Sequence, residues 1–444
     1  MKSNTTTLIA VIVVAVIAVA AVGGYIVLKD DGQDPDAVVH SSLPIMGNAN
    51  SDDFIDQRDI DLIQEIIDGE KTLADYPYAD ANNDGIIDQK DIDVTRKLIN
   101  GFKTQAFVVD QNDDIVEISY PLKNVVTINA DMLSLVLQIG AQDKVSAYVA
   151  TPYPVSQKAA DDAGALNFGK GRALDSTNYV KLIDLDVSLV DEGGVGAILA
   201  MTDAAVSTYV ADLNAAGIPV LRINCSEPID SIDASLTIGF LFGSEIATNA
   251  RAYYDASYNV IDTINEKLKD VKEEDKVKCL SLCMWSYVSE TESAYTITSQ
   301  LAGGNNISEI PGDGSSKLTS SDAITIYDEA KYFLSYRTLD YVNDDIIDTW
   351  ENSKNNILKS GQAYVDGNLV FVNAIIPVPC RIAYVAEILY PDLFESGFGD
   401  EILQSFVDDY LPYLNENQDD GVFDVKTDMT TIITKSMYDA AKIE

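Results

Sequence analysis

The sequence predicts an α/β protein of two lobes joined by one long helix, with a small helical module in front. From about Lys103 onward, short apolar runs rich in β-branched residues alternate with segments of helical period. Such alternation favours parallel sheets covered by helices. One amphipathic stretch at 232–268 keeps a helical period far longer than any other. Because α/β sequence lies on both sides of it, we expect a rigid connector between two lobes.

The N-terminus predicts a membrane-spanning helix or a signal segment within residues 1–29. Residues 8–28 are apolar or small, a length that crosses a bilayer core as a helix. Lys2 precedes this run and Asp30 follows it, which favours an orientation with the bulk of the chain outside the cytoplasm. A signal peptide shares this pattern, so anchoring and cleavage are both open. Residues 30–45 are polar and contain Pro and Gly, and they are predicted to form a linker.

Two segments within residues 46–102 repeat the ligand pattern of a calcium-binding loop. Oxygen-bearing side chains stand at loop positions 1, 3, 5, 9 and 12, and position 7 supplies a backbone carbonyl. The first set is Asn48, Asn50, Asp52, Phe54, Asp56 and Asp59, and the second is Asp80, Asn82, Asp84, Ile86, Asp88 and Asp91. An acidic, Asn-rich stretch can also be a plain solvated loop, but the fixed period favours a repeated Ca²⁺ site.

This loop and helix unit resembles the dockerin repeat, because position 12 is Asp rather than Glu and no helix precedes the loop. The second loop, DANNDGIIDQKD, matches fully, whereas the first has Asp53 where glycine would relieve a sharp turn. The resemblance implies a small all-α pair of EF-hand type and a cohesin-bearing partner. Dockerins contact cohesins through positions 10 and 11, held here by Gln57, Arg58, Gln89 and Lys90. A plain spacer is the alternative role.

Charge and composition exclude several functional classes. With 71 acidic against 30 basic residues, the net charge of −41 argues against nucleic acid or anionic lipid as a partner. The one histidine, His40, falls in the predicted linker, so no histidine-based zinc site, Ser-His-Asp triad or Cys-His dyad can form around a core histidine. The cysteines lack CxxC spacing, and buried free thiols are expected. The sequence therefore predicts a protein that is not an enzyme.

The expected elements of the α/β part follow from apolar period and length. Strands are expected at 106–109, 115–118, 125–128, 145–149, 187–190, 196–200, 219–223, 277–282, 332–335 and 369–372. Helices are expected at 130–139, 178–184, 202–216 and 354–360, besides the long stretch.

Segments in this part resemble, in order, those of the iron-siderophore and cobalamin class of ABC-transporter solute-binding proteins. The resemblance covers about residues 104–411 and begins with PLKNVV and MLSLVLQIGAQDKV. It continues through NYVKLIDLDVSLV, DLNAAGIPVLRI, IGFLFGSE, LAGGNNIS, SSDAITIYDEAKYFLSY, GQAYVDGNLVFVN and VAEILYPDLF. It implies two Rossmann-like lobes, at about 103–235 and 271–414, a connector helix at about 236–270, and a C-terminal extension at 415–444.

The resemblance also implies an extracytoplasmic protein that captures a metal chelate, such as an iron-siderophore, haem or a corrinoid, and delivers it to an ABC permease. Loops at the carboxyl ends of parallel strands face such a cleft. The expected ligand-binding residues are Tyr148, Tyr153, Lys170, Arg172, Trp285, Tyr287, Tyr336, Arg337 and Arg381. Aromatic rings would stack on the ligand and cations would meet its anionic groups. Core packing and surface ion pairs are the ordinary alternatives.

Permease docking in this class uses one acidic residue on each lobe. SSDAI places Asp322 at that position in the second lobe, where it could instead be an ordinary charge at a helix N-terminus, whereas the first lobe has Val180. Two other functions stay open. The chain could be a dockerin-bearing cell-surface scaffold that binds a cohesin partner. A dockerin-borne hydrolase is disfavoured because no nucleophile and base arrangement is visible.

Overall fold

The computed structural model describes residues 40–443, except 151–152, 284–286, 312–323, 340–345, 353–356, 417 and 419–420. The apolar run at 8–28, most of the predicted linker, Trp285 and Asp322 lie outside the described residues. Contacts divide the chain at residue 38, and everything described belongs to the second unit. In that part of the chain, no helix is long and apolar enough to cross a membrane.

The repeat module consists of two short helices that each follow a loop. Helix α2 (Gln57–Ile67) begins one residue after Asp56, which is loop position 9 of the first repeat. Helix α3 (Gln89–Ile99) begins one residue after Asp88, the same position of the second repeat. Each N-cap carboxylate accepts the backbone N–H at N3, and the N3 residue, Asp59 or Asp91, accepts the N-cap N–H in return. This reciprocal capping box fixes both helix starts by satisfying free donors. The expected loop and helix units are therefore present, with the 3₁₀ turn Pro77–Ala79 between them.

The module is packed onto the rest of the chain, and residues 40–45 do not form a linker. Leu43 and Ile45 are buried, and together with Ile55 and Leu98 they belong to the large core that also contains the long helix. Ile45 pairs with Val108 on the hairpin of β1 (Thr104–Val109) and β2 (Ile115–Tyr120). The polar composition of 30–45 concealed these two apolar anchors.

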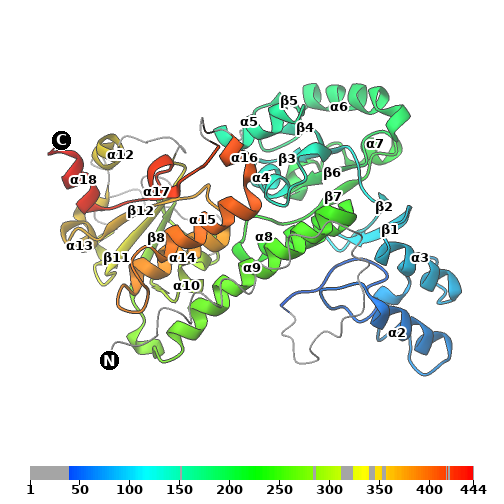
Figure 1. Ribbon diagram of the computed structural model, residues 1–444, viewed down its shortest axis with the longest axis horizontal. Helices are drawn as coiled ribbons and strands as arrows, with labels where there is room; N and C mark the ends of the chain where they lie inside the picture. The colour runs from blue at the N-terminus through cyan, green and yellow to red at the C-terminus, as the bar shows by residue number, and fades with distance from the viewer. Residues whose placement is uncertain are drawn as a thin grey trace. The chain divides into compact units, whose positions relative to one another are not determined.

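Lobe 1 contains a parallel five-stranded sheet in the order β5-β4-β3-β6-β7. Its strands are β3 (Val125–Ile128), β4 (Val145–Val149), β5 (Leu166–Gly169), β6 (Ala197–Ala200) and β7 (Val220–Arg222). Its helices are α4 (Ala130–Gln138), α5 (Pro154–Asp162), α6 (Ser176–Ser188) and α7 (Val210–Ala215), with 3₁₀ turns Gln142–Lys144, Val190–Glu192 and Asp203–Ala205. Helices lie on both faces of the sheet (Figure 1).

The predicted strand at 187–190 is wrong. These residues end α6 and begin a 3₁₀ turn, with Leu182 and Leu185 buried while Val187 and Val190 face solvent. A short apolar run of this kind fits a strand or a helix equally by period alone. The predicted helix at 202–216 is likewise two short pieces, Asp203–Ala205 and α7.

The predicted long helix is two helices, α8 (Pro228–Phe242) and α9 (Ser244–Leu268). They meet at Gly243, whose φ of +71° favours glycine. A Cβ at Gly239 of α8 would overlap Ala250 of α9, so the two helices cross at close range. Helix α9, about 38 Å long at 1.5 Å per residue, runs from lobe 1 to lobe 2 (Figure 1).

Lobe 2 contains a sheet in the order β10-β8-β11-β12-β13, with β9 paired to β8. Its strands are β8 (Lys278–Cys283), β9 (Tyr287–Val288), β10 (Asn305–Asn306), β11 (Tyr332–Arg337), β12 (Leu369–Asn373) and β13 (Ile432–Ile433). Its helices are α10 (Ala294–Leu301), α12 (Ile346–Asn352), α13 (Gln362–Val365), α14 (Val378–Leu389), α15 (Phe398–Tyr410), α16 (Pro412–Glu416), α17 (Val425–Asp428) and α18 (Lys435–Ala441), with 3₁₀ turns Glu273–Asp275, Thr325–Tyr327 and Ile357–Ser360.

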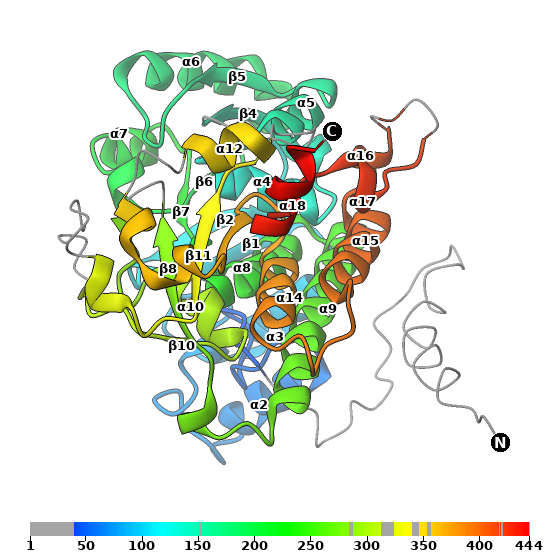
Figure 2. The same ribbon diagram turned by 90° about the vertical axis from the view of Figure 1, so that its left-hand side faces the viewer.

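The C-terminal extension completes lobe 2. Strand β13 pairs antiparallel with β12, and Ile433 is buried in the same cluster as Trp350 of α12. Tyr438 of α18 stacks on Trp350 at 5.3 Å between ring centroids and donates its hydroxyl to Glu351. Figure 2 shows α18 beside α12, although the two are far apart in sequence.

Replacing Tyr438 by alanine is expected to lower the free energy of unfolding by about 3 kcal/mol, because a buried aromatic ring and its stacking partner are lost. Chemical denaturation of the purified chain measures this difference. Ser436→Ala, on the exposed side of the same helix, is the matched control and should change stability by less than about 0.5 kcal/mol. Equal effects of the two substitutions would contradict a structural role for the extension.

Candidate functional site

A cavity of about 740 Å³ lies between the two lobes. From lobe 1 it is lined by residues that follow β3 and β7, among them Asn129, Asp131 and Cys225. From lobe 2 it is lined by the end of β11 and by α10 and α14. Both lobes thus present the carboxyl ends of parallel strands to the cavity, as α/β folds usually do for ligand sites.

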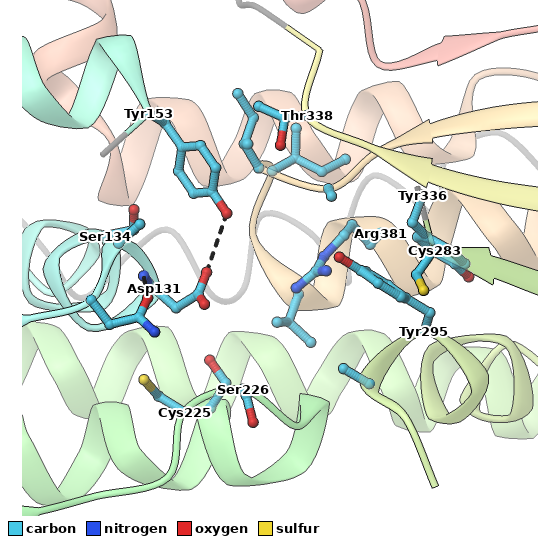
Figure 3. A pocket seen from close by; sticks show the side chains of 18 of the residues that line it. Asp131, Ser134, Tyr153, Cys225, Ser226, Cys283, Tyr295, Tyr336, Thr338 and Arg381 are labelled. Atoms are coloured by element: carbon cyan, nitrogen blue, oxygen red, sulfur yellow. Dashed lines mark hydrogen bonds between the residues drawn. The ribbon is translucent and has the colours of Figure 1, made fainter. Parts of the chain in front are cut away.

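The lobe 1 wall is built around the start of α4. Asn129 caps this helix from φ +96°, and its side chain accepts the backbone N–H of Asp131 at 3.0 Å. Asp131 then accepts the hydroxyl of Tyr153 at 3.2 Å (Figure 3). Burial, and next the charge of Asp131, raise the pKa of Tyr153, so the phenol stays protonated and continues to donate.

The lobe 2 wall is cationic and aromatic. Arg337 ends β11 and is almost fully buried, and burial lowers its pKa to about 9, which leaves it charged at neutral pH. Tyr336 stacks on Tyr295 of α10 at 4.7 Å and bonds Ser299 at 3.0 Å. Arg381, in the first turn of α14, projects toward the centre of the cavity (Figure 3).

The structure brings five of the nine predicted ligand-binding residues to the cavity. These are Tyr153, Arg172, Tyr336, Arg337 and Arg381. Tyr148 does not line it, because its ring is buried in lobe 1 and its hydroxyl bonds Asp161 at 2.7 Å. Lys170 is exposed away from the lining. Trp285 is outside the described residues, and Tyr287 is placed on β9 without a described side chain.

Sequence reasoning missed several lining residues, notably Asp131, Tyr295 and Cys225. Asp131 could have been found, since it directly follows the expected strand at 125–128 and begins a helix. Tyr295 gave no such signal, because the expected strand before it, at 277–282, ends well ahead of α10.

Of the two positions expected at the permease-docking surface, the structure describes Val180 in lobe 1 but not Asp322 in lobe 2. Val180 of α6 is 57% exposed, so an apolar side chain occupies the surface position where the family resemblance implies an acid. Asp322 lies outside the described residues.

In the first loop of the module, Asn48 is fully buried and its Oδ1 has no hydrogen-bond partner among the described residues. Asp52 and Asp56 both pair with Arg58 at position 11, at 2.8 and 2.9 Å. Burial raises the pKa of Asp59 at position 12 to about 7, although two backbone amides donate to it. The carboxylates of this loop are thus held by amides and by one guanidinium.

The second loop repeats this arrangement. Lys90 at position 11 pairs with Asp84 and Asp88, each at 3.2 Å. Gly85 at position 6 takes φ +82°, whereas Asp53 at the same position of the first loop does not have positive φ and pairs with Arg251 of α9 at 2.9 Å. Within the described ranges, no group of three or more His, Cys, Asp or Glu side chains is gathered closely enough to hold a metal ion.

No family model and no curated protein matches the sequence. Solved structures do match the fold. A periplasmic solute-binding protein of Veillonella parvula is 15% identical with a TM-score of 0.54, over 73% of this chain and 97% of that one. The chain has the fold of a periplasmic solute-binding protein. An ABC-transporter solute-binding protein of Sulfurospirillum deleyianum is 12% identical with a TM-score of 0.52, over 68% and 94% of the two chains.

A third match is a molybdate periplasmic binding protein of Haemophilus influenzae bound to molybdate, 14% identical with a TM-score of 0.52, over 68% of this chain and 97% of that chain. By their descriptions, all three are solute-binding proteins. At this level of identity the comparison establishes the two-lobed fold. Ligand and partners are argued below from the residues of this chain.

Proposed function

We propose that the chain is an extracytoplasmic solute-binding component of an ABC importer, held at the cell membrane by its N-terminal apolar segment. The observation that carries the proposal is the charge of the interlobe cavity. The chain has seven arginines and a net charge of −41, yet Arg172, Arg337 and Arg381 all line this one cavity. Two acids, Asp131 and Glu290, line it as well, so the three arginines leave an excess of positive charge, which in a cleft of an acidic protein favours a ligand with anionic groups.

The preferred ligand class is a metal chelate, such as an iron-siderophore or haem, or a corrinoid. A cavity of about 740 Å³ is much larger than a bare ion needs and lies within the range of sites for small organic ligands. The stacked pair Tyr295 and Tyr336 offers an aromatic wall for a flat or catecholate group. The guanidinium groups of Arg337 and Arg381 can bind carboxylate or phenolate oxygens.

Calorimetric titration of the purified chain with ferric siderophores, haem and cyanocobalamin tests this proposal. We expect one of these compounds to bind at a 1:1 ratio without turnover, and Arg381→Gln to weaken it at least about 30-fold. Arg96→Gln, which removes an exposed arginine of α3, is the matched control and should leave affinity unchanged. If none of the compounds binds, the proposed ligand class is wrong. Membrane fractionation with and without residues 1–29 tests the anchor.

A second proposal concerns the module: both loops bind Ca²⁺. Its support is the buried, unpartnered Oδ1 of Asn48 at position 1 of the first loop, together with the matching capping boxes that fix position 12 in both loops. The residues fit calcium in kind, because every ligating side-chain atom is an oxygen of a carboxylate or amide. The carboxylates are not yet gathered around one point, so those paired with Arg58 and Lys90 would have to turn toward the ion. Terbium luminescence competed by Ca²⁺ measures binding, and two sites are expected. Absence of competition would exclude calcium.

The alternative function is attachment to a cohesin-bearing partner, and its support is the exposure of the four expected recognition residues. Gln57, Arg58, Gln89 and Lys90 are all exposed, although the two basic residues also pair with loop carboxylates. Capture of the whole chain by an immobilised cohesin, reversed by a calcium chelator and abolished by Gln89→Ala with Lys90→Ala, would favour this function. Retention of capture in that variant would exclude the proposed recognition residues.

A further inference from the structure

The centre of the interlobe cavity holds one acid and one base that face each other from different lobes. Asp131 comes from α4 of lobe 1 and Arg381 from α14 of lobe 2, and Figure 3 shows both side chains directed into the same space. In Figure 3 the hydrogen bond drawn at Asp131 runs to Tyr153, and none joins Asp131 to Arg381. The space between them is therefore open to a ligand rather than closed by a salt bridge.

The charges of Asp131 and Arg381 both affect two tyrosines of the cavity, Tyr153 and Tyr295. Burial raises the pKa of Tyr295 in lobe 2, Arg381 opposes this, and Asp131 from the other lobe adds to it. Burial also raises the pKa of Tyr153 in lobe 1, where Asp131 adds to the shift and Arg381 opposes it. The charges of Asp131 and Arg381 thus both act on the two hydroxyls, in agreement with their place on different lobes in the lining of one cavity.

Both charged groups have unused hydrogen-bonding capacity. The Nε of Arg381 is buried and has no partner among the described residues. A buried guanidinium N–H without an acceptor is costly, and a ligand anion would satisfy it. Among the residues that the structure describes, the one side-chain donor to Asp131 is the hydroxyl of Tyr153, so a carboxylate with four acceptor sites still has room for another donor.

Each lobe also carries one charge of the other sign, Arg172 in lobe 1 and Glu290 in lobe 2. Arg172 is exposed, and Glu290 already has interactions of its own. Asp131 and Arg381 are half-buried, so solvent screens their charges less than that of Arg172, and Arg337 adds positive charge to the lobe 2 wall that carries Arg381. The central pair therefore contributes most to the polarity that the cavity presents to a ligand.

We propose that the ligand is dipolar, with an anionic group bound by Arg381 of lobe 2 and an ammonium or other N–H group bound by Asp131 of lobe 1. This inference rests on the proposed solute-binding function and narrows its ligand class. A chelate that is anionic on all sides would place negative charge against Asp131, which disfavours it. A chelate with carboxylates at one end and an amine at the other can bind Arg381 and Asp131 at the same time.

A pair of ferric probes that differ in one charge tests the proposal. The first is the ferric complex of Nα,Nα-bis(carboxymethyl)-lysine, which carries carboxylates and a free ε-amine, and the second is its ε-N-acetyl derivative. Calorimetry of the purified chain should give affinity at least about 10-fold higher for the free amine, the usual size of one charge-assisted hydrogen bond. Asp131→Asn should remove that preference, whereas Arg381→Gln should weaken both probes by the same factor.

The variants separate the possible outcomes. Asp131→Asn is isosteric, and Asp184→Asn on the exposed side of α6 is the matched control that should keep the preference. If both probes bind equally well and Asp131→Asn changes nothing, lobe 1 does not recognise a positive group and the inference is wrong, while the proposed function stands. If neither probe binds and haem, ferric siderophores and cyanocobalamin also fail, the proposed function falls together with this inference.

Discussion

Replacing Asp110 by alanine is expected to destabilise the folded chain by about 3–5 kcal/mol. Asp110 lies in the turn between β1 and β2 and is fully buried, and its Oδ2 accepts from Arg222 at 2.8 Å. Arg222 ends β7 and is only 7% exposed, so the substitution would leave a charged guanidinium buried without its main counter-ion. Asp110 Oδ1 also accepts the backbone N–H groups of Asn112 and Asp114.

Asp114→Ala provides a matched control on the same arginine. Asp114 is 65% exposed and lies 3.5 Å from Arg222, a geometry that usually contributes less than about 1 kcal/mol. Urea denaturation of the two variants, followed by tryptophan fluorescence, measures the contrast. Loss of stability of the same size in both would show that the buried pair does not fasten the hairpin to lobe 1.

The strands of this fold could be predicted because their local composition agrees with their place in the sheets. The runs at 125–128 and 145–149 are strands with the expected bounds, since a strand covered on both faces is continuously apolar. Strand β5 (Leu166–Gly169) was missed, because only Phe168 of its four residues is buried and its apolar signal is weak.

The break between α8 and α9 could not be predicted from period, because apolar residues continue in helical register across it. Gly243 ends α8, and glycines also occur inside helices, as Gly239 does four residues earlier. What distinguishes them is tertiary: Gly239 admits Ala250 of the other helix, and Gly243 supplies the turn in the backbone.

The candidate site was predicted best where residues follow strands and worst where helices supply them. Arg337 ends a strand and was expected, whereas Tyr295 belongs to a helix and was not. The placement of the module was also beyond local reasoning. Asp53 read as a flaw in a calcium loop, but in the structure it pairs with Arg251 of α9, whose guanidinium also lies 3.8 Å from the ring of Phe54.

If the loops bind calcium as proposed, Ca²⁺ is expected to stabilise the whole described body and not the module alone. Leu43, Ile55 and Leu98 share one core with α9, and Arg251 ties the first loop to that helix. Binding to the folded state alone adds about 2.7 kcal/mol for each site at a Ca²⁺ concentration 100 times the dissociation constant. Calorimetry should therefore show one transition that moves to higher temperature with Ca²⁺ and returns with chelator.

Variants of the loops locate the effect. Asp59→Asn and Asp91→Asn each alter position 12 of one loop and should reduce the Ca²⁺-dependent shift, while Asp93→Asn on the exposed side of α3 should preserve it. Arg251→Gln removes the ion pair with Asp53 and should therefore lower the stability of the chain without Ca²⁺. It should also reduce the rise in melting temperature that Ca²⁺ causes through the first loop. Separate melting of the module, or a shift that is insensitive to both position-12 variants, would contradict a calcium-stabilised body that includes the connector helix.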